Sequence, residues 1–249
     1  MNFDEVLSHH LVDHPIVLLF SIHGHPFYLT RHALMMLIAA FLVLVLGWTG
    51  ARQTSSVPHG WRNMLEALIV YMRDEVVRPS LGAEGDRYLS YFMSLFFFIL
   101  FCNLLGLVPW GASATGNIAV TGTLALSTFV MISFTGIRHH GVLHYFKNYV
   151  PAGLPWYMVP VIFPIEIFGV FTKSFALCIR LFANMLGGHI AILAFMSLIF
   201  LFHSMGIALI TVVVLLGLSL LELFVAILQA YIFTMLTVVF VGGAVNPQH

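Results

Sequence analysis

Apolar residues occur in long runs along this chain, and short polar segments separate the runs. The first run extends from Ala33 to Trp48, the second from Leu89 to Trp110 and the third from Asn117 to Ile137. The hydrocarbon core of a membrane is about 30 Å thick, which a helix of about 20 apolar residues crosses. We therefore expect three membrane spans here, with Pro109 closing the second.

The last apolar run, from Val159 to Gly243, is longer than ordinary spans require. Its second part alone, Met205 to Val241, would form a helix about 55 Å long. The only obvious break in the pattern lies between His203 and Gly206. We expect a hairpin of two long helices that cross the membrane at a steep tilt and turn near Ser204–Met205.

A charged segment, Ala51 to Arg87, follows the first run. Between Trp61 and Val77 its apolar residues recur at helical spacing, and its charged residues lie elsewhere around the helix. The apolar positions are Trp61, Met64, Leu65, Leu68, Ile69 and Met72. This pattern predicts an amphipathic helix on the membrane surface or on a partner helix, ended by Pro79 and Gly82.

Composition supports a membrane protein, because 60% of the 249 residues are hydrophobic and only 8% are charged. Soluble domains carry about 25% charged residues. The predicted fold class is an all-α polytopic membrane protein with about three transmembrane helices, one amphipathic surface helix and the C-terminal hairpin. We expect one membrane domain, 1–249, made of a polar N-terminal tail (1–32), transmembrane and interfacial helices (33–158) and the tilted hairpin (159–243).

Several classes of partner and site are not indicated. The net charge is zero, which suggests no nucleic-acid partner, and Cys102 and Cys178 both lie in apolar runs, as packing residues do. The N-terminus lacks a basic region before an apolar stretch, so we expect no cleavable targeting peptide. No glycine-rich loop ends in Lys followed by Ser or Thr, so we expect no nucleotide site. We also expect no metal and no cofactor.

The basic residues of the loops predict the orientation of the chain. The N-terminal tail has only Arg31, and the loop after the third run has Arg138 and Lys147. The segment after the first run carries Arg52, Arg62, Arg73, Arg78 and Arg87. Because basic loops stay on the inner side of a membrane, we expect the N-terminus outside and the C-terminus inside.

Polar side chains interrupt the last apolar run at regular intervals. Glu166, Lys173 and Arg180 are seven residues apart, so they share one face of a helix. Asn184 follows on the same face, and His189 lies roughly half a rotation away from Arg180. Ionisable groups within a membrane span are costly and usually mark a functional site.

The second half of the hairpin carries one acid, Glu222, and one amide, Gln229, which also share a face. A turn at Ser204–Met205 sets Arg180 level with Gln229, and His189 level with Glu222. The pattern therefore predicts that the hairpin brings these polar groups together.

Arg180 has no obvious acidic partner within the chain. Glu166 is about four helical turns away, and Glu222 is better matched to His189. A structural salt bridge is the alternative, but we expect the partner to be a carboxylate on another subunit. His189 by itself would be a packing residue, whereas His189 with Glu222 can relay protons. Lys173 can instead extend to the membrane surface from a helix end.

Three motifs carry a family resemblance. The segment RLFANMLGGH begins at Arg180, LELFVAILQAYIFTMLT surrounds Gln229, and NLLGLVP occupies Asn103–Pro109. Together they resemble subunit a of F-type ATP synthases, over nearly the whole chain. The resemblance implies a membrane stator with no catalytic nucleotide site, beside a rotating c-ring of c subunits. It also implies peripheral stalk b subunits and the remainder of the ATP synthase complex as partners.

The resemblance assigns roles to these residues. Arg180 matches the essential arginine that faces the c-ring, Asn184 its neighbouring asparagine, and Gln229 the glutamine opposite the arginine. Two offset aqueous half-channels would carry protons to and from the c-ring carboxylates, and Arg180 would separate them. This chain has Gly106 where some bacterial members carry an acid.

The remaining matches fall on the expected proton path. His189 and Glu222 match positions of the outer half-channel, and Glu166 and Lys173 match positions beside the inner one. Asn103 belongs to the second-span motif and is expected on the same path.

Two other classes of function remain as alternatives. A self-contained proton-coupled transporter or channel would show an internal repeat, and we find none. A haem-binding subunit would need histidines within spans, but of the 13 histidines only His189 and His203 meet this requirement. The N-terminal histidines fit a solvated tail better than a metal site. The long charged segment favours a bacterial inner membrane over a mitochondrial one.

Overall fold

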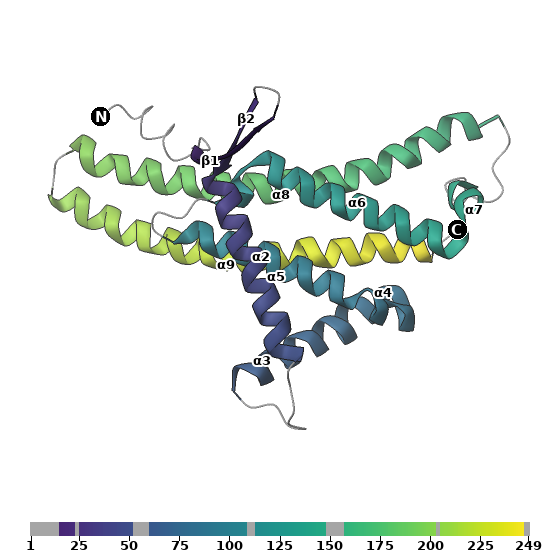
Figure 1. Ribbon diagram of the computed structural model, residues 1–249. Helices are drawn as coiled ribbons and strands as arrows, with labels where there is room; N and C mark the ends of the chain where they lie inside the picture. The colour runs from purple at the N-terminus through teal and green to yellow at the C-terminus, as the bar shows by residue number, and fades with distance from the viewer. Residues whose placement is uncertain are drawn as a thin grey trace. The chain divides into compact units, whose positions relative to one another are not determined.

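The computed structural model describes residues 15–22, 25–51, 60–108, 113–147, 157–202 and 205–246 (Figure 1). The elements in chain order are the strands β1 (Pro15–Ile22) and β2 (His25–Thr30), then helices α2 (Arg31–Ala51), α3 (Trp61–Tyr71), the π-helix η1 (Met72–Val77), α4 (Arg78–Leu81), the 3₁₀ helix η2 (Gly82–Arg87), α5 (Leu89–Leu107), the 3₁₀ helix η3 (Ala114–Gly116), α6 (Ile118–His140), α7 (Val142–Lys147), α8 (Val159–Phe202) and α9 (Met205–Val245).

Five of these helices, α2, α5, α6, α8 and α9, are long and apolar enough to cross a membrane. The prediction of an all-α polytopic membrane protein is therefore confirmed. Individual boundaries differ from the expected ones by a few residues. Helix α5 ends at Leu107, before the expected Trp110, because the residue preceding Pro109 is disfavoured in a helix.

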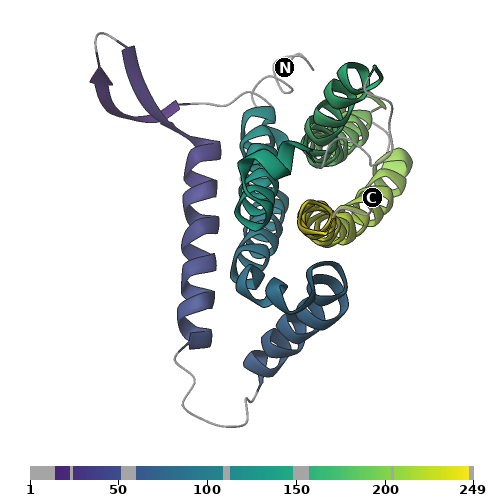
Figure 2. The same cartoon turned by 90° about the vertical axis from the view of Figure 1, so that its right-hand side faces the viewer.

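A two-stranded antiparallel hairpin precedes α2, in a region that we expected to be a polar tail (Figure 2). Its register pairs Pro15 with Thr30 and Ile22 with His25. The strand sequences PIVLLFSI and HPFYLT are rich in β-branched and aromatic residues, which favour strands. The histidines at positions 9, 10, 14 and 23 lie outside the described residues.

The surface helix is present. We expected Pro79 and Gly82 to end it, but the helix continues past Pro79. Its helical course continues through η1 and α4 to Leu81, and Pro79 occupies the first turn of α4. Pro79 has no backbone N–H to donate, and it follows directly on the irregular π-helical turn η1. Gly82 ends the course with a φ of +64°, which suits glycine. Met72 is fully buried, whereas Met64 is 69% exposed.

The structure divides into two compact units, each assembled from separate parts of the chain. The first contains Met1–Gly47, Phe97–Thr121 and Arg180–Ala230. The second contains Trp48–Phe96, Gly122–Ile179 and Tyr231–His249.

In the first unit, an apolar cluster joins α2, α5 and η3. Ala39, Cys102 and Ala114 are fully buried at its centre. The hydrophobic residues packed against them are Met35, Met36, Phe98, Phe101 and Leu105. In the same unit, parts of α8 and α9 run side by side (Figures 1 and 2). Helix α8 ends at Phe202 and α9 begins at Met205, where we expected the hairpin to turn, although Ser204 itself is outside the described residues.

In the second unit, hydroxyl groups pair between helices. The Thr128 and Thr237 hydroxyls lie 3.4 Å apart between α6 and α9, and the Tyr71 and Tyr231 hydroxyls lie 3.3 Å apart. Between membrane helices such hydrogen bonds add modestly to packing, by about 0.6 kcal/mol on average.

Candidate functional site: the polar residues of the α8–α9 hairpin

The two long helices meet at Arg180 and Gln229. The side chain of Gln229 is only 4% exposed, and its Nε2 donates a hydrogen bond to the backbone carbonyl oxygen of Arg180 at 3.4 Å. This contact has the register that a turn at Ser204–Met205 implies. Because the acceptor is a backbone carbonyl, the amide holds the position of α9 against α8 and leaves the Arg180 guanidinium outside the bond.

Arg180 is exposed, and so is Asn184 one turn further along α8. Among the residues that the structure describes, Arg73 and Arg78 form salt bridges with aspartates, and Arg180 forms none. A guanidinium is permanently charged, and a lone charge in a membrane span usually faces a partner or water. The arrangement therefore presents a cation that an external acid could approach.

Glu222 is the buried acid of the hairpin. It is 5% exposed, and neither of its carboxyl oxygens has a hydrogen-bond partner among the residues that the structure describes. The carboxyl group lies against the backbone of Gly188 on α8, so closely that a Cβ added there would come within 2.5 Å of Oε1. A larger residue at this position would have to displace the carboxyl group.

Gly188 was missed in the sequence analysis. The available signal was the pair Gly187–Gly188 within a helix, since glycine costs about 1 kcal/mol relative to alanine there and often marks close packing. His189 follows directly and is half-buried. The structure thus brings Gly188, His189 and Glu222 to the same level of the hairpin, two turns of α8 beyond Arg180.

Glu166 and Lys173 lie on the part of α8 that belongs to the second unit. Glu166 is half-buried. Lys173 is exposed, and its Nζ lies 5.6 Å from the ring centre of Phe240 on α9, within the range of a cation–π interaction.

Asn103 on α5 is fully buried and makes two hydrogen bonds within the first unit. Its Nδ2 donates to the carbonyl oxygen of Ala226 at 3.2 Å, and its Oδ1 accepts from the Thr115 hydroxyl at 2.7 Å. The sequence motif pointed to Asn103 but to neither of its partners. No periodic pattern could have found them, because the three residues come from distant segments.

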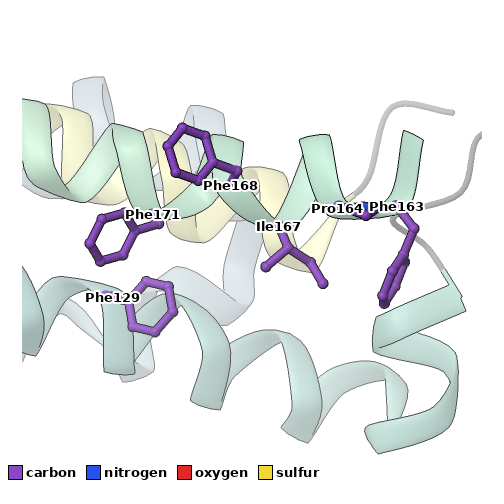
Figure 3. A pocket seen from close by; sticks show the side chains of 6 residues that line it. All are labelled: Phe129, Phe163, Pro164, Ile167, Phe168 and Phe171. Atoms are coloured by element: carbon purple, nitrogen blue, oxygen red, sulfur yellow. The ribbon is translucent and has the colours of Figure 1, made fainter. Parts of the chain in front are cut away.

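An apolar cavity of about 460 Å³ lies between α6 and α8 in the second unit (Figure 3). Phe129 on α6 faces Phe171 and Ile167 on α8, and the other lining residues are Phe163, Pro164 and Phe168. No titratable side chain lines it, so it has no groups that could relay protons. In the described ranges, no three residues among His, Cys, Asp and Glu lie close enough together to hold a metal ion.

Comparison with known proteins identifies the family. The family model described as ATP synthase A chain matches residues 33–242. ATP synthase subunit a of Myxococcus xanthus (strain DK1622) is 45% identical over 225 residues, which are 89% of this chain and 74% of that protein. Subunit a of Anaeromyxobacter sp. (strain Fw109-5) is 44% identical over 87% of this chain and 54% of its own length.

A third relative, subunit a of Chloroherpeton thalassium (strain ATCC 35110 / GB-78), is 43% identical over 89% of this chain and 68% of its own length. The chain thus spans between about half and three quarters of these relatives. A family model matched over most of the chain and identities of 43–45% lead to one conclusion: this multi-pass integral membrane chain belongs to the family of ATP synthase subunit a, a membrane subunit of the Fo sector.

Proposed function

We propose that this chain is the stator subunit that carries protons to and from the c-ring, through two offset aqueous half-channels that Arg180 separates. The observation that carries the proposal is the placement of Arg180. Its guanidinium is exposed on α8 without an ion-pair partner in the described part of the chain, and Gln229 bonds only to its backbone. The family to which the chain belongs supports an acid of another Fo subunit as the group that meets Arg180.

The mechanism follows from electrostatics. A carboxyl group on a c subunit is neutral while it faces lipid, because a bare charge there is expensive. It loses its proton to one half-channel as it reaches this subunit, and the resulting carboxylate is attracted to Arg180. The attraction must be transient, so that the ring can advance and the acid can take a proton from the other half-channel.

Arg180 has a second role in this mechanism. Its fixed positive charge repels protons and prevents them from passing directly between the half-channels. Each proton that crosses at 100 mV supplies about 2.3 kcal/mol, and several such steps together drive ATP formation elsewhere in the complex.

The other polar residues would line the two half-channels. His189 and Glu222 serve the outer half-channel, and their shared level in the hairpin supports this assignment. Glu166 and Lys173 lie further towards the start of α8 and serve the inner half-channel. Asn184 borders Arg180. The N-terminus is outside, the C-terminus is inside, and the membrane is a bacterial inner membrane. The c-ring and the peripheral stalk b subunits are the direct partners.

The test is ATP-driven proton pumping in inverted vesicles that contain the whole complex. Arg180→Ala should abolish coupled pumping and allow a passive proton leak. Arg180→Lys should also fail, since a hydrated point charge is a poor replacement for a guanidinium. Arg138→Ala removes another exposed arginine, at the end of α6, and serves as the matched control. Pumping near the wild-type rate in Arg180→Ala vesicles would contradict the proposed mechanism.

A further inference from the structure

Three segments of the first unit meet in one buried polar contact. Asn103 on α5, Thr115 in η3 and Ala226 on α9 are each 0% exposed. Thr115 Oγ1 lies 2.7 Å from Asn103 Oδ1, and Asn103 Nδ2 lies 3.2 Å from the Ala226 carbonyl oxygen. The Ser113 hydroxyl lies 3.4 Å from that of Thr115 and extends the chain of hydrogen bonds.

The direction of these bonds determines the orientation of the Asn103 amide. A hydroxyl can donate to the amide oxygen, so the amide nitrogen is left to donate to Ala226. If the amide were flipped, its oxygen would face the Ala226 carbonyl oxygen, and two acceptors would meet without a proton between them. The Ala226 carbonyl, which can only accept, therefore fixes the orientation of the amide. Thr115 supplies the donor that the amide oxygen needs in that orientation and so anchors Asn103 against α9.

The return of the chain onto α5 depends on Gly106. A Cβ at Gly106 would lie 2.8 Å from the Cβ of Ser113. The absence of a side chain lets the segment that carries Ser113 and Thr115 pack directly on α5. Close packing at this point delivers the Thr115 hydroxyl to Asn103.

Ala226 lies between the two polar residues of α9. It comes four residues after Glu222 and three before Gln229, so all three share one face of the helix. On that face Gln229 bonds to Arg180, and Glu222 lies against Gly188. A hydrogen bond to the Ala226 carbonyl therefore constrains the rotation of α9 midway between these two contacts.

We propose that Asn103 and Thr115 are positioning residues. Through the Ala226 carbonyl they hold the face of α9 that carries Glu222 and Gln229 against α8. Asn103 does not relay protons in this role, because both ends of its amide are already bonded and an amide does not titrate near neutral pH. The inference rests on the proposed function only for its effect on proton pumping, and its geometric part can be tested separately.

The geometric test places cysteines at positions 180 and 229 in a chain whose Cys102 and Cys178 are replaced by alanine. The measurement is the rate at which a short bifunctional thiol reagent joins the two cysteines in membranes. Thr115→Val keeps the shape of the side chain and removes the donor. It should slow crosslinking at least about threefold, because the buried amide oxygen of Asn103 loses its donor and the amide is no longer anchored from that side. Thr115→Ser retains the hydroxyl and should restore the wild-type rate.

Thr121→Val is the matched control. Thr121 is as buried as Thr115 and also lies in the first unit, but its hydroxyl bonds the carbonyls of Asn117 and Ile118. Thr121→Val should leave the rate of crosslinking between positions 180 and 229 unchanged. Asn103→Leu removes both polar ends of the amide and keeps the branching of the side chain, although its two methyl groups are bulkier than the amide. It provides a second variant should Thr115→Val assemble poorly. If Asn103 and Thr115 act as one unit, the double variant should slow crosslinking no more than Asn103→Leu alone.

The functional test repeats the single substitutions in the native chain and measures proton pumping per assembled complex. We expect Thr115→Val and Asn103→Leu to lower it about fivefold or more, and Thr115→Ser and Thr121→Val to leave it within about twofold of wild type. Unchanged crosslinking in both Thr115→Val and Asn103→Leu would overturn the proposal, even if pumping fell. Slower crosslinking with normal pumping would also overturn it. Neither result bears on the role of Arg180, which the Arg180→Ala experiment tests alone.

Discussion

The side-chain amide of Gln229 donates a hydrogen bond to the backbone carbonyl oxygen of Arg180, with 3.4 Å between Nε2 and O. This bond joins α9 to α8 at the level of the charge and leaves the guanidinium outside the bond. An amide is well suited to this place, because it can position a neighbour without adding a charge.

Gln229→Leu should weaken proton pumping several-fold without abolishing it, unlike Arg180→Ala. The reason is that the substitution removes one hydrogen bond, worth about 0.5–1.5 kcal/mol, but not the charge. Gln229→Glu keeps the shape and places an acid beside Arg180. It should be more harmful than Gln229→Leu, because a fixed carboxylate would compete with the acid of the c subunit. Pumping rates per assembled complex decide the order, and the reverse order would contradict the role of Gln229 as a neutral support.

Cysteines at positions 180 and 229 should be joined by a short bifunctional thiol reagent, since α carbons of facing positions on packed helices lie within about 10 Å. A direct disulfide would need α carbons within about 7 Å. The control pair is 180 with 220, because Leu220 is exposed on α9 but lies nine residues from Gln229. If positions 180 and 220 crosslinked efficiently and positions 180 and 229 did not, the register of the hairpin would be refuted.

Gly188→Ala should impair proton translocation, because the added Cβ would come within 2.5 Å of Glu222 Oε1. Gly187→Ala is a matched control on the same helix turn, since nothing lies within 4 Å of a Cβ added there. It should stabilise α8 by up to about 1 kcal/mol. Adding Glu222→Asp, which shortens the acid by one methylene, should partly restore pumping to Gly188→Ala. If Gly188→Ala and Gly187→Ala changed proton translocation equally, the close approach of Glu222 to Gly188 would not matter for function.

His189 and Glu222 should behave as a pair in proton translocation. Glu222→Gln and His189→Ala should each slow it and alter its pH dependence, because each removes a titrating group. The exchange of the two residues, His189→Glu with Glu222→His, should recover more activity than the single changes predict. A double-mutant cycle on proton flux measures this coupling. Strict additivity, with no recovery on exchange, would mean that the two residues act independently.

The 3₁₀ helix η2 (Gly82–Arg87), which follows the surface helix, should lose order in acid. Arg78 donates hydrogen bonds to Asp86 and holds the pKa of that carboxyl below its usual value, and Arg73 does the same for the pKa of Asp74. Because the pKa of each aspartate is lower in the folded state, each of the two ion pairs stabilises the fold above the ordinary aspartate pKa of about 3.9. This stabilisation is lost as pH falls through the lower, folded value.

Asp86→Asn mimics the protonated state at neutral pH. It should increase hydrogen exchange in residues 82–87 of the purified complex. Arg78→Gln should have the same effect, whereas Arg87→Gln, which changes an exposed arginine outside this network, should not. Equal exchange rates in all three variants and wild type would show that the ion pairs do not order η2.

The positions of the membrane helices were evident from the sequence. Runs of apolar residues of sufficient length can be accommodated only as helices that cross the membrane, so α2, α5, α6, α8 and α9 were expected near where they lie. The register between Arg180 and Gln229 also followed, because a single break in a long apolar run leaves one place for the turn. The β-hairpin was missed because the polar composition of the tail masked two short runs of β-branched and aromatic residues. The continuation of the surface helix past Pro79 was missed because a proline within a helical pattern predicts a helix end.

Only the tertiary structure revealed which small and neutral residues support the polar site. Periodicity shows which face of a helix a residue occupies, but not how closely another backbone approaches it. At Gly188 a carboxyl group occupies the space where a Cβ would lie, and the carbonyl of Ala226 accepts a hydrogen bond from another helix. Such contacts join residues that are distant in sequence, whereas a one-dimensional pattern records only near neighbours. The sequence by itself therefore determined the helices and their charged groups, and the packing of those helices decided what holds the charged groups in place.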